Sequence, residues 1–114
     1  MSTETTIPPV TTVTRSNRRA TIAVCATDQG LPVEIRVDRQ ELRYGAAALA
    51  DEIMRLCRQA TLEAGALRRE ELAEAGIATD VLDRLGLPTR DQVVTQETHF
   101  EERETAPTSW LRPV

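Results

Sequence analysis

The feature that most constrains the fold is a change of hydrophobic period between residues 33 and 73. Apolar and charged residues alternate strictly over Val33–Asp38, the period-two pattern of a β-strand. Over Ala46–Ala73, apolar residues instead recur every three or four positions, the spacing of an amphipathic helix. A strand followed directly by a helix of this length predicts an α+β domain in which the helix lies on a sheet.

Two more strands are predicted before this one. The run Val10–Arg15 is rich in β-branched residues, and Ala20–Thr27 alternates larger apolar residues with small ones. Ser16-Asn17 and the segment 28–30 are typical turn sequences, so the connections are expected to be antiparallel. We therefore predict a three-stranded antiparallel sheet whose last strand packs Val33, Ile35 and Val37 inside and leaves its charged residues in water.

Only one Phe, one Tyr and one Trp occur in the chain, so the core must be built mainly from aliphatic residues. A modest core of this kind often gains stability from a second copy of the chain, and we expect a homodimer. The helix carries a narrow apolar stripe, which either covers the sheet or binds a partner. The candidate dimer or partner surface on this stripe consists of Leu49, Ile53, Leu56 and Ala60. The free edge of the sheet is the other candidate.

The remaining segments give a domain division. Residues 1–9 are Thr-rich and end in two prolines, which indicates a flexible lead-in to a domain at 10–90. A short second helix is predicted over Asp80–Leu85, with Thr79 as its N-cap. Residues 91–114 are acidic and lack clear periodicity, so they are expected to form a disordered tail, in which Phe100 or Trp110 could dock on a partner.

Several functional classes are excluded by what the sequence lacks. The single histidine, His99, has no cysteine nearby, and no phosphate-binding, dinucleotide-binding or nucleophile-elbow motif occurs. We expect no enzyme activity, no cofactor and no metal, with Cys25 and Cys57 as buried thiols. No apolar run is long enough for a membrane span, and no signal-peptide pattern is present, so a cytoplasmic location is expected.

The charge distribution gives little support to nucleic-acid binding. All 14 basic residues are arginine, and the net charge is −4. Strong non-specific DNA binding needs many cationic contacts to phosphate. A local basic patch is the alternative, and its candidate nucleic-acid contacts are Arg15, Arg18, Arg19, Arg36 and Arg39.

The phrase GLPVEIRVDRQELRYGAAALADEIMRLCRQA, with LPT at residues 87–89 before an acidic segment, resembles the YbaB/EbfC group of small bacterial proteins. It is more closely similar to the actinobacterial EspD/EspH-like branch associated with ESX-type (type VII) secretion. This resemblance, over about residues 19–104, implies a YbaB-like fold and a non-catalytic, dimeric accessory protein that binds a protein partner of the secretion system. The alternative that it implies is a DNA-binding, nucleoid-associated protein.

The chain departs from the group in two respects. YbaB/EbfC proteins open with a helix before their strands, whereas this chain has a proline-broken lead-in, so their dimer and DNA grip are not carried over. Type VII substrates carry a Tyr-x-x-x-Asp/Glu signal, but Tyr44 is followed four positions later by Ala48. An accessory role inside the cell is therefore expected, and not export.

Overall fold

The structure, a computed structural model, describes residues 10–105 of the chain. Its strands pair in the order β1-β2-β3, all antiparallel, and helices follow, which confirms the predicted α+β layout. The elements are β1 (Thr12–Ser16), β2 (Ile22–Thr27), β3 (Pro32–Val37), the 3-10 helix η1 (Arg39–Tyr44), α1 (Ala46–Glu74), α2 (Thr79–Arg84) and α3 (Arg90–Thr105). The bounds of α1 differ from the predicted helix by a single residue.

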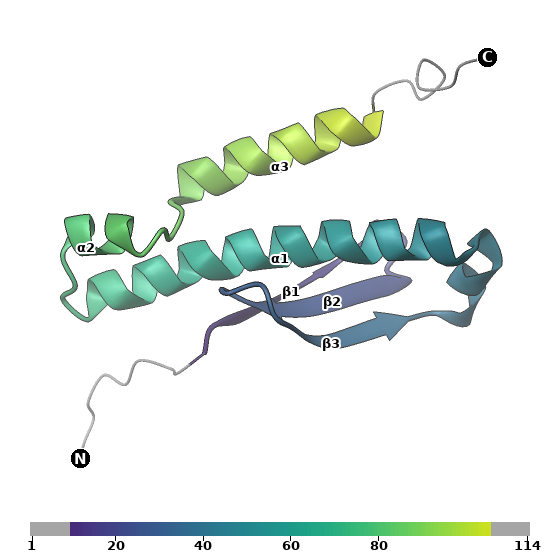
Figure 1. Cartoon of the computed structure of the whole chain (residues 1–114), viewed down its shortest axis with the longest axis horizontal. Helices are drawn as coiled ribbons and strands as arrows, with labels where there is room; N and C mark the ends of the chain where they lie inside the picture. Colours follow the sequence, from purple (N-terminus) through teal and green to yellow (C-terminus); the bar gives the residue numbers. More distant parts are fainter. Residues whose placement is uncertain (1–9, 106–114) are drawn as a thin grey trace.

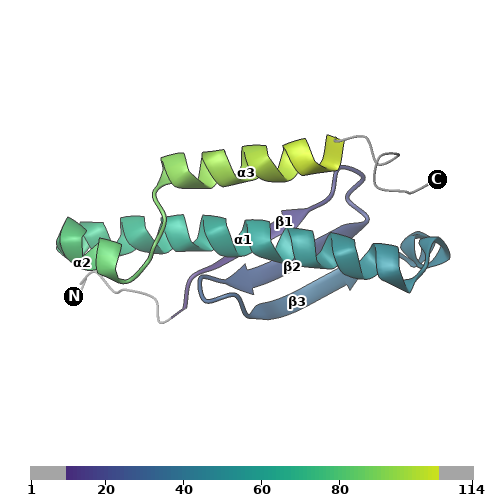
Figure 2. The same ribbon diagram turned by 45° about the horizontal axis from the view of Figure 1, so that its top comes forward.

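The elements form three layers. Figure 1 shows α1 running along one face of the sheet, with α3 on the opposite side of α1. In the turned view of Figure 2, α3 again lies alongside α1, and the turn between β1 and β2 rises toward it. Helix α1 is therefore the central layer, and it contacts both the strands and α3.

The strand register decides which side chains share a face. Val24 in β2 stands opposite Arg15 in β1 and Ile35 in β3, so these three side chains point to the α1 side of the sheet. Cys25 stands between Thr14 and Glu34, which therefore point to the outer side. A register shift follows Cys25, where β2 meets the start of β3.

The core lies between β2 and α1. Ile22 and Val24 pack with Leu56, and all three are almost fully buried. Further along α1, Ala60 and Ala64 are also buried. Their small side chains let the helix approach the sheet closely, which is the arrangement that the alanine-rich stripe predicts.

Residues 85–89 form the joint between α2 and α3, which packs against α1. The short helix α2 begins at Thr79, and its N-cap is Ala78, which offers no side-chain hydrogen bond, so the prediction of Thr79 as N-cap was wrong. After α2, the ring of Pro88 lies against Gly65 in the middle of α1. Arg69 of α1 fixes the same joint, because its Nη1 donates a 2.7 Å hydrogen bond to the carbonyl oxygen of Leu87.

The predicted disordered tail begins as an ordered helix. The hydroxyl of Thr89 accepts a hydrogen bond from the backbone N–H of Gln92, and the Gln92 side chain accepts one from Thr89 N–H, at 3.1 and 2.9 Å. This reciprocal cap starts α3, and Val93 is then buried beneath it. The prediction of disorder was therefore wrong for residues 91–105. The lead-in at 1–9 and the predicted docking residue Trp110 lie outside the described residues, as does the side chain of Phe100.

Candidate interaction surface

The helical stripe that was predicted as a partner surface lies against the sheet. Leu56 and Ala60 are 1% and 0% exposed, and Leu49 and Ile53 pack on the buried side chains of β2. A side chain buried in the core cannot contact another molecule unless the domain opens. Leu56 and Ala60 are therefore used to cover the sheet and cannot form a partner surface, whereas Leu49 and Ile53 are half-buried at its border.

An apolar surface remains on β3 instead. Val33, Ile35 and Val37 are 53%, 45% and 36% exposed, although Ile35 stands opposite the fully buried Val24 on the α1 side. The alternation correctly placed the three residues on one face. The expectation that this face packs within the chain was wrong.

The width of a helix explains why β3 is left uncovered. A helix with its side chains is about 10 Å wide, and neighbouring strands lie about 4.8 Å apart, so one helix covers about two strands. Helix α1 packs on β2 and β1, and β3 is the strand farthest from it (Figures 1 and 2). The third strand of the sheet is therefore exposed on its apolar face.

The outer edge of β3 is also open, and its hydrogen-bonding groups can be assigned. The N–H of Asp38 donates to the carbonyl oxygen of Thr21 at 2.7 Å, so Asp38 turns its backbone groups toward β2. Because this direction alternates along an antiparallel strand, Ile35 and Val37 turn their N–H and C=O groups away from β2. Within residues 10–105, no strand pairs with that edge.

Opposite charges alternate along the outer face of the same strand. The Nε of Arg36 donates a 2.8 Å hydrogen bond to Glu34. This hydrogen bond and the charge of Glu34 raise the pKa of Arg36. The sequence-based search considered Arg36 only as a phosphate contact and missed its pairing with Glu34. The signal was present as an acid and a base two positions apart on one strand.

An apolar hollow lies on the exposed side of α1. It has a volume of about 460 Å³. Met54 and Leu62 are its largest apolar lining residues, and Cys57 also lines it. Gly30, in the turn that leads into β3, also lines it. The turn before β3 and the exposed side of α1 thus share an apolar hollow.

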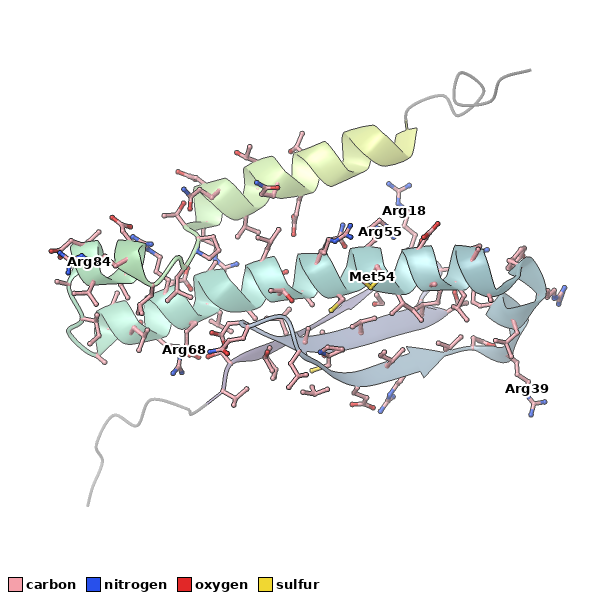
Figure 3. All side chains as sticks on the ribbon, in the orientation of Figure 1. Arg18, Arg39, Met54, Arg55, Arg68 and Arg84 are labelled. Atoms are coloured by element: carbon pink, nitrogen blue, oxygen red, sulfur yellow. The ribbon has the colours of Figure 1, made fainter. Side chains whose placement is uncertain are left out.

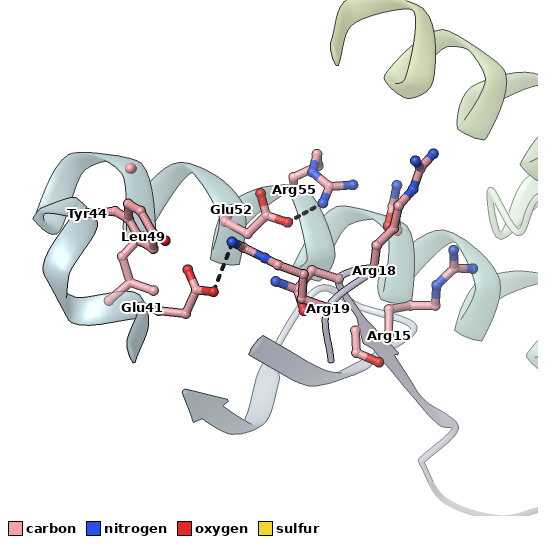
Figure 4. Close-up of a pocket in the computed structure, with 12 residues that line it drawn as sticks. Arg15, Arg18, Arg19, Glu41, Tyr44, Leu49, Glu52 and Arg55 are labelled. Atoms are coloured by element: carbon pink, nitrogen blue, oxygen red, sulfur yellow. Dashed lines mark hydrogen bonds and ion pairs between the residues drawn. The ribbon is translucent and has the colours of Figure 1, made fainter. Parts of the chain in front are cut away.

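The structure brings three of the five candidate nucleic-acid contacts together. Arg15, Arg18 and Arg19 line one hollow at the turn between β1 and β2, together with Arg55 of α1 (Figure 4). Carboxylates pair with most of the arginines in this cluster. Arg19 lies 2.9 Å from the buried carboxylate of Glu41, its guanidinium is over the Tyr44 ring, and Arg55 is paired with Glu52.

The side chain of Arg15 connects β1 to α1 and α3. Its Nη1 lies 2.6 Å from the carboxylate of Glu63 in α1 and 2.9 Å from that of Glu97 in α3. Partial burial disfavours the charge of Arg15, but the hydrogen bonds and charges of the two carboxylates outweigh this effect, so the pKa of Arg15 is raised. Its guanidinium is thus held inside the domain by two acids.

The other two candidate contacts lie apart from this cluster. Arg36 is on the outer face of β3, where it pairs with Glu34. Arg39 is the first residue of η1, and Figure 3 shows Arg18 and Arg39 on opposite sides of α1. The five arginines therefore do not form one continuous basic surface.

The described part of the chain contains no cluster of three or more His, Cys, Asp or Glu residues that could hold a metal ion. Cys25 and Cys57 are both free thiols, and they are half-buried where full burial was predicted. Among residues 10–105, no helix combines the length and the apolar character needed to cross a membrane.

Comparison of the chain with protein-family models, with curated proteins and with solved structures finds no match. The resemblance to the YbaB/EbfC group therefore stays a prediction.

Proposed function

We propose that the chain is a non-catalytic protein-interaction module that works as a homodimer, a YbaB-like accessory protein of type VII secretion located in the cytoplasm. The observation that carries this proposal is the uncovered third strand. β3 combines an exposed apolar face with an open, hydrogen-bonding edge. Edges of this kind are templates for pairing with another chain, and natural proteins usually blunt or cover them.

The opposite edge of the sheet is a weaker candidate. Thr12, Thr14 and Ser16 of β1 are exposed and polar, while Val13 and Arg15 are half-buried on the α1 side. The head of Arg15 is already held by two carboxylates. The edge at β1 is therefore polar and the edge at β3 apolar, which supports β3 as the binding edge.

The polar side chains of the large hollow at the β1–β2 turn support a non-catalytic role. Glu41 accepts hydrogen bonds from Thr21 Oγ1 at 2.5 Å and pairs with Arg19 at 2.9 Å, while Glu52 pairs with Arg55. A general base or nucleophile must be free to reach a substrate atom. Glu41 and Glu52 are instead each engaged by an arginine of their own domain.

The test of this proposal is the oligomeric state. Sedimentation velocity at micromolar concentration should show a dimer, and Ile35→Asp should convert it to a monomer, because the substitution places a charge in the centre of β3. Val94→Asp is the matched control, since Val94 is also an exposed apolar residue but lies on α3. A wild-type chain that stays monomeric throughout this range would contradict the proposal. Co-purification with type VII secretion components tests the accessory role separately.

A further inference from the structure

We propose that the second copy of the chain docks by antiparallel pairing of β3 with β3, about a two-fold axis through Ile35 and perpendicular to the sheet. This inference rests on the proposed homodimer and specifies its register. It joins two three-stranded sheets into one sheet of six strands, with both α1 helices on the same side.

The backbone of β3 permits this axis. A residue that lies on the axis faces its own symmetry mate, and it can exchange both main-chain hydrogen bonds with that mate if its N–H and C=O point outward. The backbone N–H and C=O of Ile35 point away from β2, since those of Asp38 bond to β2 and the direction alternates along the strand. Val33 of each copy then stands opposite Val37 of the other, so every residue from 33 to 37 has a partner across the axis.

The charges on the outer face select this axis over its neighbours. With the axis at Ile35, Glu34 of each copy stands opposite Arg36 of the other, giving two ion pairs. An axis at Glu34 would oppose two glutamates, and an axis at Arg36 would oppose two arginines, which is unfavourable across a strand pair. Axes at Val33 or Val37 would carry the pairing into the turn at Gly30 or into η1.

The apolar face gains from the same register. Because opposed residues share a face, Ile35 meets Ile35 and Val33 meets Val37 on the α1 side of the joined sheet. All three side chains are exposed in the single chain. An interface made by one strand edge lies toward the small end of specific interfaces, and we expect a micromolar dissociation constant.

Charge reversal at the two outer residues tests the register. Glu34→Arg opposes arginine to arginine at both contacts, and Arg36→Glu opposes glutamate to glutamate. Each single variant should weaken self-association by about tenfold, because two cross-strand attractions become repulsions. The double variant, Glu34→Arg with Arg36→Glu, should dimerise like the wild type. Circular dichroism checks that each exposed substitution leaves the fold unchanged.

Mixing the two single variants distinguishes the proposed pairing between two chains from the contact of Glu34 with Arg36 within one strand. In a mixed dimer, both arginines of the first chain face both glutamates of the second, so native mass spectrometry should show heterodimers of wild-type affinity. The bond between residues 34 and 36 of one strand stays broken in the mixture and cannot produce this result. Single variants that dimerise like the wild type, or a mixture no better than its components, would overturn the register and leave the homodimer standing. A monomeric wild type would overturn both.

Discussion

Pro88 occupies the space that a side chain on Gly65 would need. A Cβ atom built on Gly65 would lie 2.8 Å from Cδ and 3.2 Å from Cγ of Pro88, closer than such atoms normally approach. Glycine inside a helix costs about 1 kcal/mol relative to alanine. Here, the missing side chain lets the joint between α2 and α3 lie directly on α1.

Gly65→Ala should therefore destabilise the domain by about 1–3 kcal/mol, because the clash with a rigid ring outweighs the gain in helix propensity. Urea unfolding followed by circular dichroism measures the change. Pro88→Ala added to the same chain should recover much of the loss, and Pro88→Ala alone is the control. An increase in stability for Gly65→Ala would show that the joint moves away freely.

Arg15→Met should loosen α3 more than any other element. Methionine keeps much of the apolar stem but removes the group that lies between Glu63 and Glu97. All three side chains are about one-third exposed, so solvent screens the pairs, and we expect an effect of about 1 kcal/mol. Hydrogen exchange should show faster exchange in α3 and little change in β2.

Arg18→Met is the matched control for this experiment, since Arg18 lies on the same hairpin and is exposed. It should leave exchange in α3 unchanged. Equal effects of the two substitutions would mean that charge near the hairpin, and not the bridge from Arg15, holds α3.

We expect no DNA binding in a gel-shift experiment at low salt. Arg15, Arg19 and Arg36 are paired with carboxylates, and Arg39 lies apart from the hairpin cluster. Phosphate binding would require these pairs to break, and the net charge of −4 opposes the approach of DNA. A shift that weakens steeply with salt and disappears in the Arg18→Ala plus Arg19→Ala variant would contradict this and support the nucleoid-associated alternative.

The strands and α1 could be predicted because their patterns are local. Alternation over residues 33–37 and the stripe through Ile53 and Leu56 follow directly from the geometry of one strand and one helix. The exposure of β3 could not be predicted in the same way. Alternation indicates which residues share a face, but the position of α1 over two of three strands depends on how separate elements pack.

Helix α3 was missed for a different reason. Val93 is its one buried apolar side chain within the described part, so no stripe marks the helix. Its start signal was nevertheless present, since Thr89 followed three positions later by Gln92 is a capping-box pattern. The partners of Arg15 could not be identified from sequence, because Glu63 and Glu97 are 48 and 82 positions away.

The two carboxylates that hold Arg15 are synthesised at different times. Glu97 leaves the ribosome 82 residues after Arg15, when the strands and α1 have already been made. The sheet and its covering helix are therefore synthesised before α3. Both partners of the Arg15–Glu63 pair are thus present in the growing chain before Glu97, which makes the contact with α3 the later of the two that Arg15 can form.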